Sequence, residues 1–256
     1  MTEIRGIEKN ILFTLITLHY NFKSMVKSTI ISAHKANNLF WLGRYEERVY
    51  ITLHQLSKCC DKMIDGERND YLPIWQKLDS TGNYQTNDEF TVGMMYDETN
   101  PSSIMSAQTR AMDNAILLRE EIMSETLGYL EMSVALLKEC RNKQEMNLCN
   151  LQPVIDWSLA FWGAAEQRLH NHEALYIMMM GRNVENLDML LRFDYDHERI
   201  ALAYDSLKRY LRHMPGLLNK DIESQLDKLI ASRRTKSADT EYKNSLLSLL
   251  NQLTKI

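Results

Sequence analysis

The stretch Leu39-Phe40-Trp41-Leu42-Gly43-Arg44-Tyr45-Glu46-Glu47-Arg48 decides the fold class. Its pattern returns in Ile177-Met178-Met179-Met180-Gly181-Arg182-Asn183-Val184-Glu185-Asn186. Both stretches contain four apolar residues, Gly-Arg, two further residues and Glu, and apolar positions at helical spacing follow. Such spacing predicts amphipathic helices. Two copies of the Gly-Arg-x-x-Glu motif at this length favour an internal duplication.

The helical periodicity sorts the motif residues into two pairs. At about 100° per residue, Gly43 and Glu47 lie roughly 40° apart, on the flank of the apolar seam. Arg44 and Arg48 stack one turn apart, nearly opposite position 46, where Glu46 interrupts the seam. The second copy repeats these pairs as Gly181 with Glu185 and Arg182 with Asn186.

The two pairs have different expected roles. A glycine within a helix costs roughly 1 kcal/mol relative to alanine, so we expect close approach of another helix to offset that cost. A glutamate beside that glycine would be partly buried and would need a cationic partner, such as an arginine of the other copy. Two interpretations stay open: a structural polar network between the motif helices, or a site where arginines bind an anionic ligand that glutamates position.

The rest of the chain predicts an all-α fold, a multi-helix bundle that contains the two pseudo-repeated motif helices. The 256 residues include 45% hydrophobic ones but only 9 Gly and 4 Pro, which favours long helices and few turns. Helices are expected at about 32–63, 72–78, 88–95, 104–122, 126–140, 153–169, 175–193, 197–213, 221–231 and 240–253. We expect residues 1–29 to be an N-terminal extension, with Met25 as an alternative start, and residues 30–256 to form a single domain.

Composition and motifs argue against several classes of function. The net charge of -4 without a basic tail argues against nucleic-acid binding. No apolar run approaches the roughly 18 residues of a membrane span. The 4 cysteines lack CxxC spacing, which favours a reducing, cytoplasmic location. No Glu-x-x-His pair, phosphate-binding loop or nucleophile motif occurs, so the sequence predicts no metal and no cofactor and identifies no catalytic residue.

Several motifs together carry a family resemblance. The stretch from Asn38 to Arg48 resembles the opening of the alpha-E domain family, helical bacterial proteins named for a Glu-Arg motif. Asn100-Pro101-Ser102-Ser103-Ile104 resembles the family's Asn-Pro-Ser-Ser element, and the second motif copy resembles its second Glu-Arg copy. The resemblance covers about residues 30 to 255. Asn114, Arg119 and Glu125 also resemble residues of the family's pattern. Glu46, Met112 and Asn186 depart from that pattern.

The resemblance implies partners more than chemistry. Members of the family typically accompany ATP-grasp-type and transglutaminase-like proteins, which implies a helical accessory protein in a peptide or amide modification system. The alternative is an enzyme or anionic-ligand-binding protein; self-association into a homo-oligomer is a third hypothesis. The predicted polar-network or ligand-binding residues are Arg44, Glu47, Arg48, Arg119, Arg182 and Glu185, and the predicted structural residues are Gly43, Gly181, Asn114 and Glu125.

Overall fold

A computed structural model describes residues 31–64, 78, 84, 86–144, 148–232 and 240–256. Contacts divide the chain after Ile31, and all the described helices belong to the unit Ser32–Ile256. The expected extension, residues 1–29, lies outside the described residues, as does most of the helix expected at 72–78.

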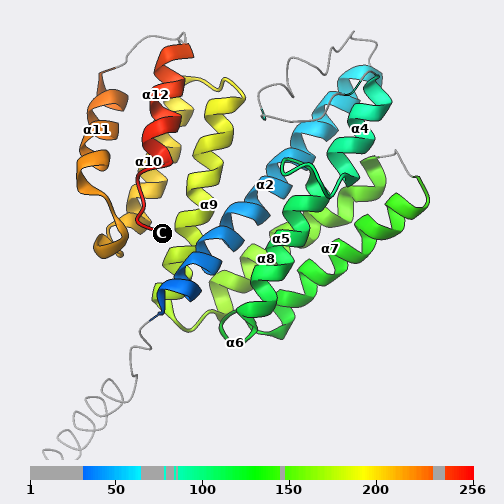
Figure 1. Ribbon diagram of the computed structural model, residues 1–256, viewed down its shortest axis with the longest axis horizontal. Helices are drawn as coiled ribbons and strands as arrows, with labels where there is room; N and C mark the ends of the chain where they lie inside the picture. Colours follow the sequence, from blue (N-terminus) through cyan, green and yellow to red (C-terminus); the bar gives the residue numbers. More distant parts are fainter. Residues whose placement is uncertain (1–30, 65–77, 79–83, 85, 145–147, 233–239) are drawn as a thin grey trace, which may run out of the picture. The chain divides into compact units, whose positions relative to one another are not determined.

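The all-α prediction is confirmed. In the described part of the chain, regular structure consists of helices, together with an isolated bridge between Leu218 and Thr254 (Figure 1). The helices are α2 (Ala33–Ile64), α4 (Asn87–Tyr96), α5 (Ile104–Leu117), α6 (Arg119–Ile122), α7 (Ser124–Asn142), α8 (Gln152–Arg168), α9 (His172–Arg192), α10 (His197–Leu211), α11 (Lys220–Ala231) and α12 (Thr240–Leu250), with short 3-10 turns η2 (Leu148–Leu151) and η3 (Pro215–Leu217).

Helix α2 occupies the centre of this arrangement. It packs most extensively on α9 and next on α5, so segments more than a hundred residues apart lie side by side (Figure 1). Its seam is buried as the spacing predicts: Leu39, Leu42 and Leu56 are completely buried. Burying side chains of this size contributes about 1.5–3 kcal/mol each. The seam therefore fixes which faces of α2 meet α9 and α5.

The Asn-Pro-Ser-Ser turn leads into α5. The N-cap of α5 is Ser103, whose Oγ accepts a hydrogen bond from the backbone N–H of Ser106. The Asn100 side chain accepts a hydrogen bond from the backbone N–H of Ser102. A side chain bonded to the backbone two residues later closes a turn, so Asn100 shapes the loop that leads into the cap.

The remaining helices surround this centre. Helices α7 and α8 pack together beside α5, while α10 and α12 pack on α9, and α11 packs on α12. The break expected near residues 170–173 is present: α8 ends at Arg168, and Asn171 caps α9 by accepting hydrogen bonds from the backbone N–H groups of Glu173 and Ala174. This break lets α9 turn back along α2 and brings the second motif to the first.

Candidate functional site

The two motif glycines form the closest contact between α2 and α9. A Cβ atom on Gly43 would lie 2.1 Å from the carbonyl oxygen of Met178, and one on Gly181 would lie 2.0 Å from the carbonyl oxygen of Phe40. Each of these carbonyls stands three residues before the glycine of the other copy. The contact is thus reciprocal, and both positions exclude any side chain.

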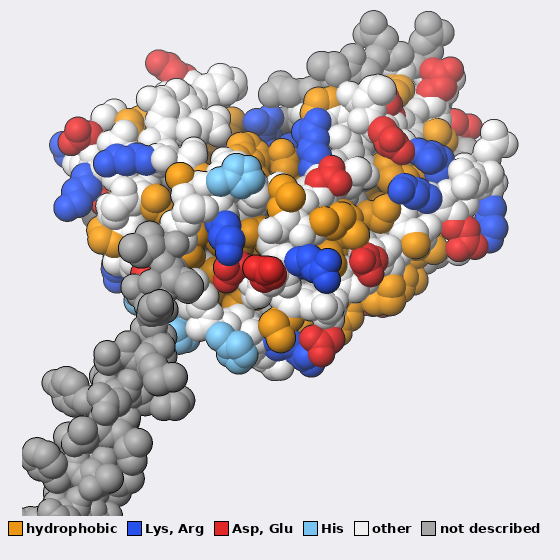
Figure 2. Space-filling view, turned by 60° about the horizontal axis from the view of Figure 1, so that its bottom comes forward, with side chains coloured by type: hydrophobic (Ala, Val, Ile, Leu, Met, Phe, Trp, Pro, Cys, Tyr) orange, Lys and Arg blue, Asp and Glu red, His pale blue; other side chains and the backbone are white. Residues whose placement is uncertain are grey.

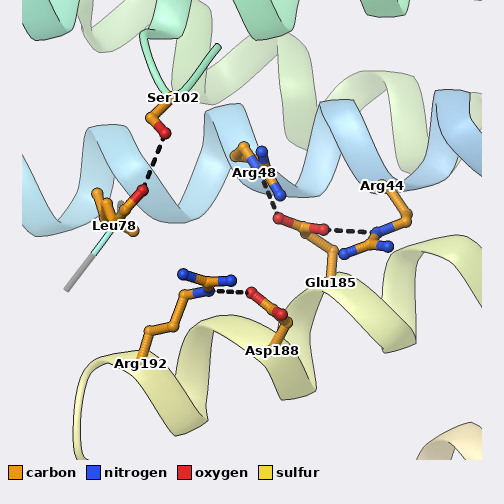
Figure 3. A network of polar contacts seen from close by, with 7 residues as sticks. All are labelled: Arg44, Arg48, Leu78, Ser102, Glu185, Asp188 and Arg192. Atoms are coloured by element: carbon orange, nitrogen blue, oxygen red, sulfur yellow. Dashed lines mark hydrogen bonds and ion pairs between the residues drawn. The ribbon is translucent and has the colours of Figure 1, made fainter. Parts of the chain in front are cut away.

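This close approach allows the charged motif residues to pair across the two helices. Glu185 of α9 is completely buried and accepts hydrogen bonds from two arginines of α2. Arg44 donates through Nε over 2.7 Å, and Arg48 donates through Nε over 2.5 Å (Figure 3). Removing one member of such a buried set typically costs about 3–5 kcal/mol, since a charge is left without compensation.

The second cross-pair is weaker because it holds one arginine instead of two. Arg182 of α9 donates through Nε to Glu47 of α2 over 3.0 Å, and its guanidinium lies 4.4 Å from the ring centre of Trp162. Asn186 stands where the first copy has Arg48. Glu47 therefore lacks the second cation that Glu185 has.

The pKa values of the two glutamates follow the number of arginines that each one contacts. Burial raises the pKa of Glu185, but the charges and hydrogen bonds of Arg48 and Arg44 outweigh burial and hold the pKa below its usual value. Burial also raises the pKa of Glu47, and Arg182 alone does not reverse that effect. The first network is consequently the more firmly ionised of the two.

A further buried carboxylate joins three helices. Glu46 of α2 accepts a hydrogen bond from the Ser158 hydroxyl of α8 over 2.6 Å and one from the Gln108 amide of α5 over 3.2 Å. No cation is among these partners, and burial raises the pKa of Glu46 to about 7 against the lowering effect of the two hydrogen bonds. The Oε1 atom of Gln108 is buried without a partner. If the Gln108 amide turns, Oε1 can accept a hydrogen bond from the protonated carboxyl group of Glu46.

A pocket opens beside the Glu185 network. It has a volume of about 240 Å³ and polar walls formed by Arg48, Thr52, Ser102 and Arg192. Figure 3 shows Arg192 of α9 bonded to Asp188 across from Arg48, and Ser102 donating to the backbone oxygen of Leu78. Arg48 is the residue through which the buried motif network meets this pocket.

The other residues predicted from the sequence lie away from the cross-pairs. Arg119 is exposed at the first residue of α6. Glu125 is exposed in the first turn of α7 and pairs with Arg168 of α8 over 2.9 Å. Asn114 is half-buried on α5 and lines a separate pocket of about 340 Å³ together with Arg110.

Sequence reasoning missed the partners that these groups meet in space. Ser158 and Gln108 carry no motif, and Thr52, Asp188 and Arg192 read as ordinary helix residues. One usable signal exists: Arg192 follows Asp188 by four residues, a spacing that pairs charges on one helix face.

The described surface carries charged side chains of both signs. On the face drawn in Figure 2, basic and acidic side chains lie next to one another, with hydrophobic side chains between them. Within the described ranges, no group of three or more His, Cys, Asp or Glu side chains could hold a metal ion. None of the helices described is both long and apolar enough to cross a membrane.

The chain was compared with known proteins. A family model named Alpha-E, described as a predicted alpha-helical domain with a conserved ER motif, matches residues 31–197. The chain belongs to the Alpha-E family. The matched region includes both motif helices and the Glu47-Arg48 pair, while α11 and α12 lie beyond it. No curated protein and no solved structure matches the chain.

Proposed function

We propose that this Alpha-E protein is a helical accessory protein in a bacterial, cytoplasmic, ATP-grasp-linked system that modifies peptides or amides. The proposal combines the family resemblance with the chemistry of the motif. An accessory protein needs a stable framework and a surface for its partner, while an enzyme needs reactive groups that substrate can reach.

The observation that carries the proposal is the cross-pairing of the motif residues. Arg44 and Arg48 donate to Glu185, and Arg182 donates to Glu47. Both glutamates are buried, with exposed fractions of 0% and 6%. Charged groups that neutralise one another inside the protein align two helices, and this favours a structural role for the motif over a catalytic one.

An exposed apolar group supports a docking role for the end of α5. Ile116, Leu117 and Met123 are 47%, 62% and 40% exposed, and they lie within one short segment around α6. Exposed apolar side chains favour contact with another protein where they form a continuous patch. We propose that an ATP-grasp-type enzyme contacts this segment and that a transglutaminase-like protein belongs to the same system.

Co-expression with an ATP-grasp-type protein from the same genome tests the proposal. Size-exclusion chromatography with light scattering should show a complex, and the substitution Leu117→Glu should reduce its amount. Leu202→Glu on α10 is the matched control because Leu202 is 63% exposed, about the same as Leu117 at 62%.

The masses measured by light scattering separate the outcomes. A complex that Leu117→Glu weakens and Leu202→Glu spares supports the proposal. The absence of a complex with ATP-grasp-type partners contradicts it, and a dimer of the chain by itself would instead favour self-association.

A further inference from the structure

We propose that the pocket between α2, α9 and the start of α10 binds arginine as a free amino acid, with its guanidinium group on Glu47. The pocket has a volume of about 280 Å³, and Glu47 and Asn186 stand in its wall. Binding of an amino acid needs no partner protein, so this inference stands apart from the proposed accessory role.

The unequal bonding of the two motif glutamates provides the first argument. Glu185 accepts hydrogen bonds at both carboxylate oxygens, at Oε2 from Arg44 and at Oε1 from Arg48. Glu47 accepts one at Oε2 from Arg182 over 3.0 Å, and no donor among the described side chains reaches its Oε1 atom. A buried carboxylate is stabilised by further donors, so Glu47 can gain from a second cation.

The pocket lies where that second cation would stand. Asn186 occupies in the second motif the position that Arg48 occupies in the first, and Asn186 lines the pocket together with Glu47. A guanidinium beside Asn186 can donate to Oε1 of Glu47 as Arg48 donates to Oε1 of Glu185. The planar fork of a guanidinium matches a carboxylate, which favours this group over a simple ammonium.

Aromatic side chains stand in the same wall. Tyr50 of α2 and Tyr195, which precedes α10, line the pocket and are half-buried. Aromatic rings attract cations, and this protein already has such a contact where the Arg182 guanidinium lies 4.4 Å from the ring centre of Trp162. The aromatic wall therefore favours a guanidinium over a neutral group of the same shape.

The pocket also carries positive charge at a distance from Glu47. The Arg199 guanidinium lies 4.7 Å from the ring centre of Tyr195, whose hydroxyl accepts a hydrogen bond from the Gln55 amide over 3.0 Å. Gln55 follows Glu47 by eight residues on α2, which places the two residues about 12 Å apart along the helix axis. Glu47 and Arg199 thus belong to opposite ends of the pocket.

This arrangement selects a ligand that carries charges of both signs. Lys58 and Arg199 line the pocket and are exposed, as is His54, which adds positive charge when it is protonated. A purely cationic ligand would meet their repulsion, whereas the carboxylate of an amino acid can pair with Lys58 and Arg199. A volume of about 280 Å³ is below the roughly 300 Å³ at which pockets for drug-sized ligands begin, which suits a single amino acid.

Isothermal titration calorimetry on the full chain tests the site with L-arginine, L-citrulline and agmatine at equal ionic strength. L-Citrulline has a neutral urea group in place of the guanidinium, and agmatine lacks the carboxylate. L-Arginine should bind saturably at one site per chain, and each analogue should bind at least about tenfold more weakly, because each loses a hydrogen bond between charged groups. Comparable binding of either analogue would overturn the proposal, as would the absence of saturable L-arginine binding.

Two variants on α9 locate the bound guanidinium. Asn186→Arg should abolish L-arginine binding, because the new side chain takes the place of the ligand beside Glu47. Asn183→Arg is the matched control: Asn183 is half-buried on the same helix, as Asn186 is, but it does not line the pocket, so binding should be unchanged. Equal affinities of these two variants for L-arginine would overturn the proposal.

A third variant tests the end of the pocket assigned to the carboxylate. Arg199→Gln should reduce the preference for L-arginine over agmatine, since agmatine has no carboxylate to lose a partner. A preference that stays unchanged in this variant would overturn the assignment of the two ends.

Discussion

Replacement of Glu46 by glutamine should change how stability depends on pH. Burial raises the pKa of Glu46 from 4.5 to about 7. The folded protein therefore keeps this proton in a range where the unfolded chain releases it, and stability falls as pH rises from 4.5 to about 7. At 1.36 kcal/mol per pKa unit, the loss amounts to about 3 kcal/mol, most of which falls between about pH 5 and pH 8.

A Glu46→Gln variant stays neutral throughout this range. Its amide can accept from Ser158 and, once the Gln108 amide turns, donate to the Oε1 atom of Gln108. Urea denaturation followed by circular dichroism at several values between about pH 5 and pH 8 should show the variant gaining roughly 2 to 3 kcal/mol on the original chain. The exposed Glu131, replaced by glutamine, serves as the control and should leave the pH dependence unchanged. Parallel curves for the original chain and Glu46→Gln would refute the reasoning.

Two further predictions concern the crossing of α2 and α9. Gly43→Ala and Gly181→Ala should each lower the free energy of unfolding by about 3 kcal/mol or more, because the new methyl group meets backbone of the other helix at 2.1 and 2.0 Å. Gly163→Ala, with nothing within 4 Å, should instead raise it by up to about 1 kcal/mol, and similar effects at all three positions in urea denaturation would contradict the account. Asn186→Arg should add a second cation beside Glu47, where a pocket of about 280 Å³ leaves room. That variant should gain about 1 kcal/mol at pH 8, and a loss of stability would count against the asymmetry between the two networks.

Local spacing predicted the helices because residues three and four positions apart lie on the same face of a helix. The buried seam at Leu39, Leu42 and Leu56 follows from that spacing. The mid-helix glycines predicted a close crossing, and charge complementarity predicted an arginine of one copy beside a glutamate of the other. These inferences need only the two motif copies and general energetics.

The sequence could not predict contacts between segments that share no motif. Glu46 meets Gln108 at a separation of 62 residues and Ser158 at a separation of 112. Neither partner has a distinctive neighbourhood in the sequence, so the bond depends on how α5 and α8 pack.

The central claim is that the two Gly-Arg-x-x-Glu motifs hold α2 and α9 together through cross-pairing. A double-mutant cycle of Arg44→Gln and Glu185→Gln, read by urea denaturation, tests this claim most directly. The buried pair at 2.7 Å should show a coupling of about 2 kcal/mol, while a control cycle on the exposed Arg168 and Glu125 pair should stay below about 0.5 kcal/mol. Additivity of Arg44→Gln and Glu185→Gln to within about 0.5 kcal/mol would contradict the account.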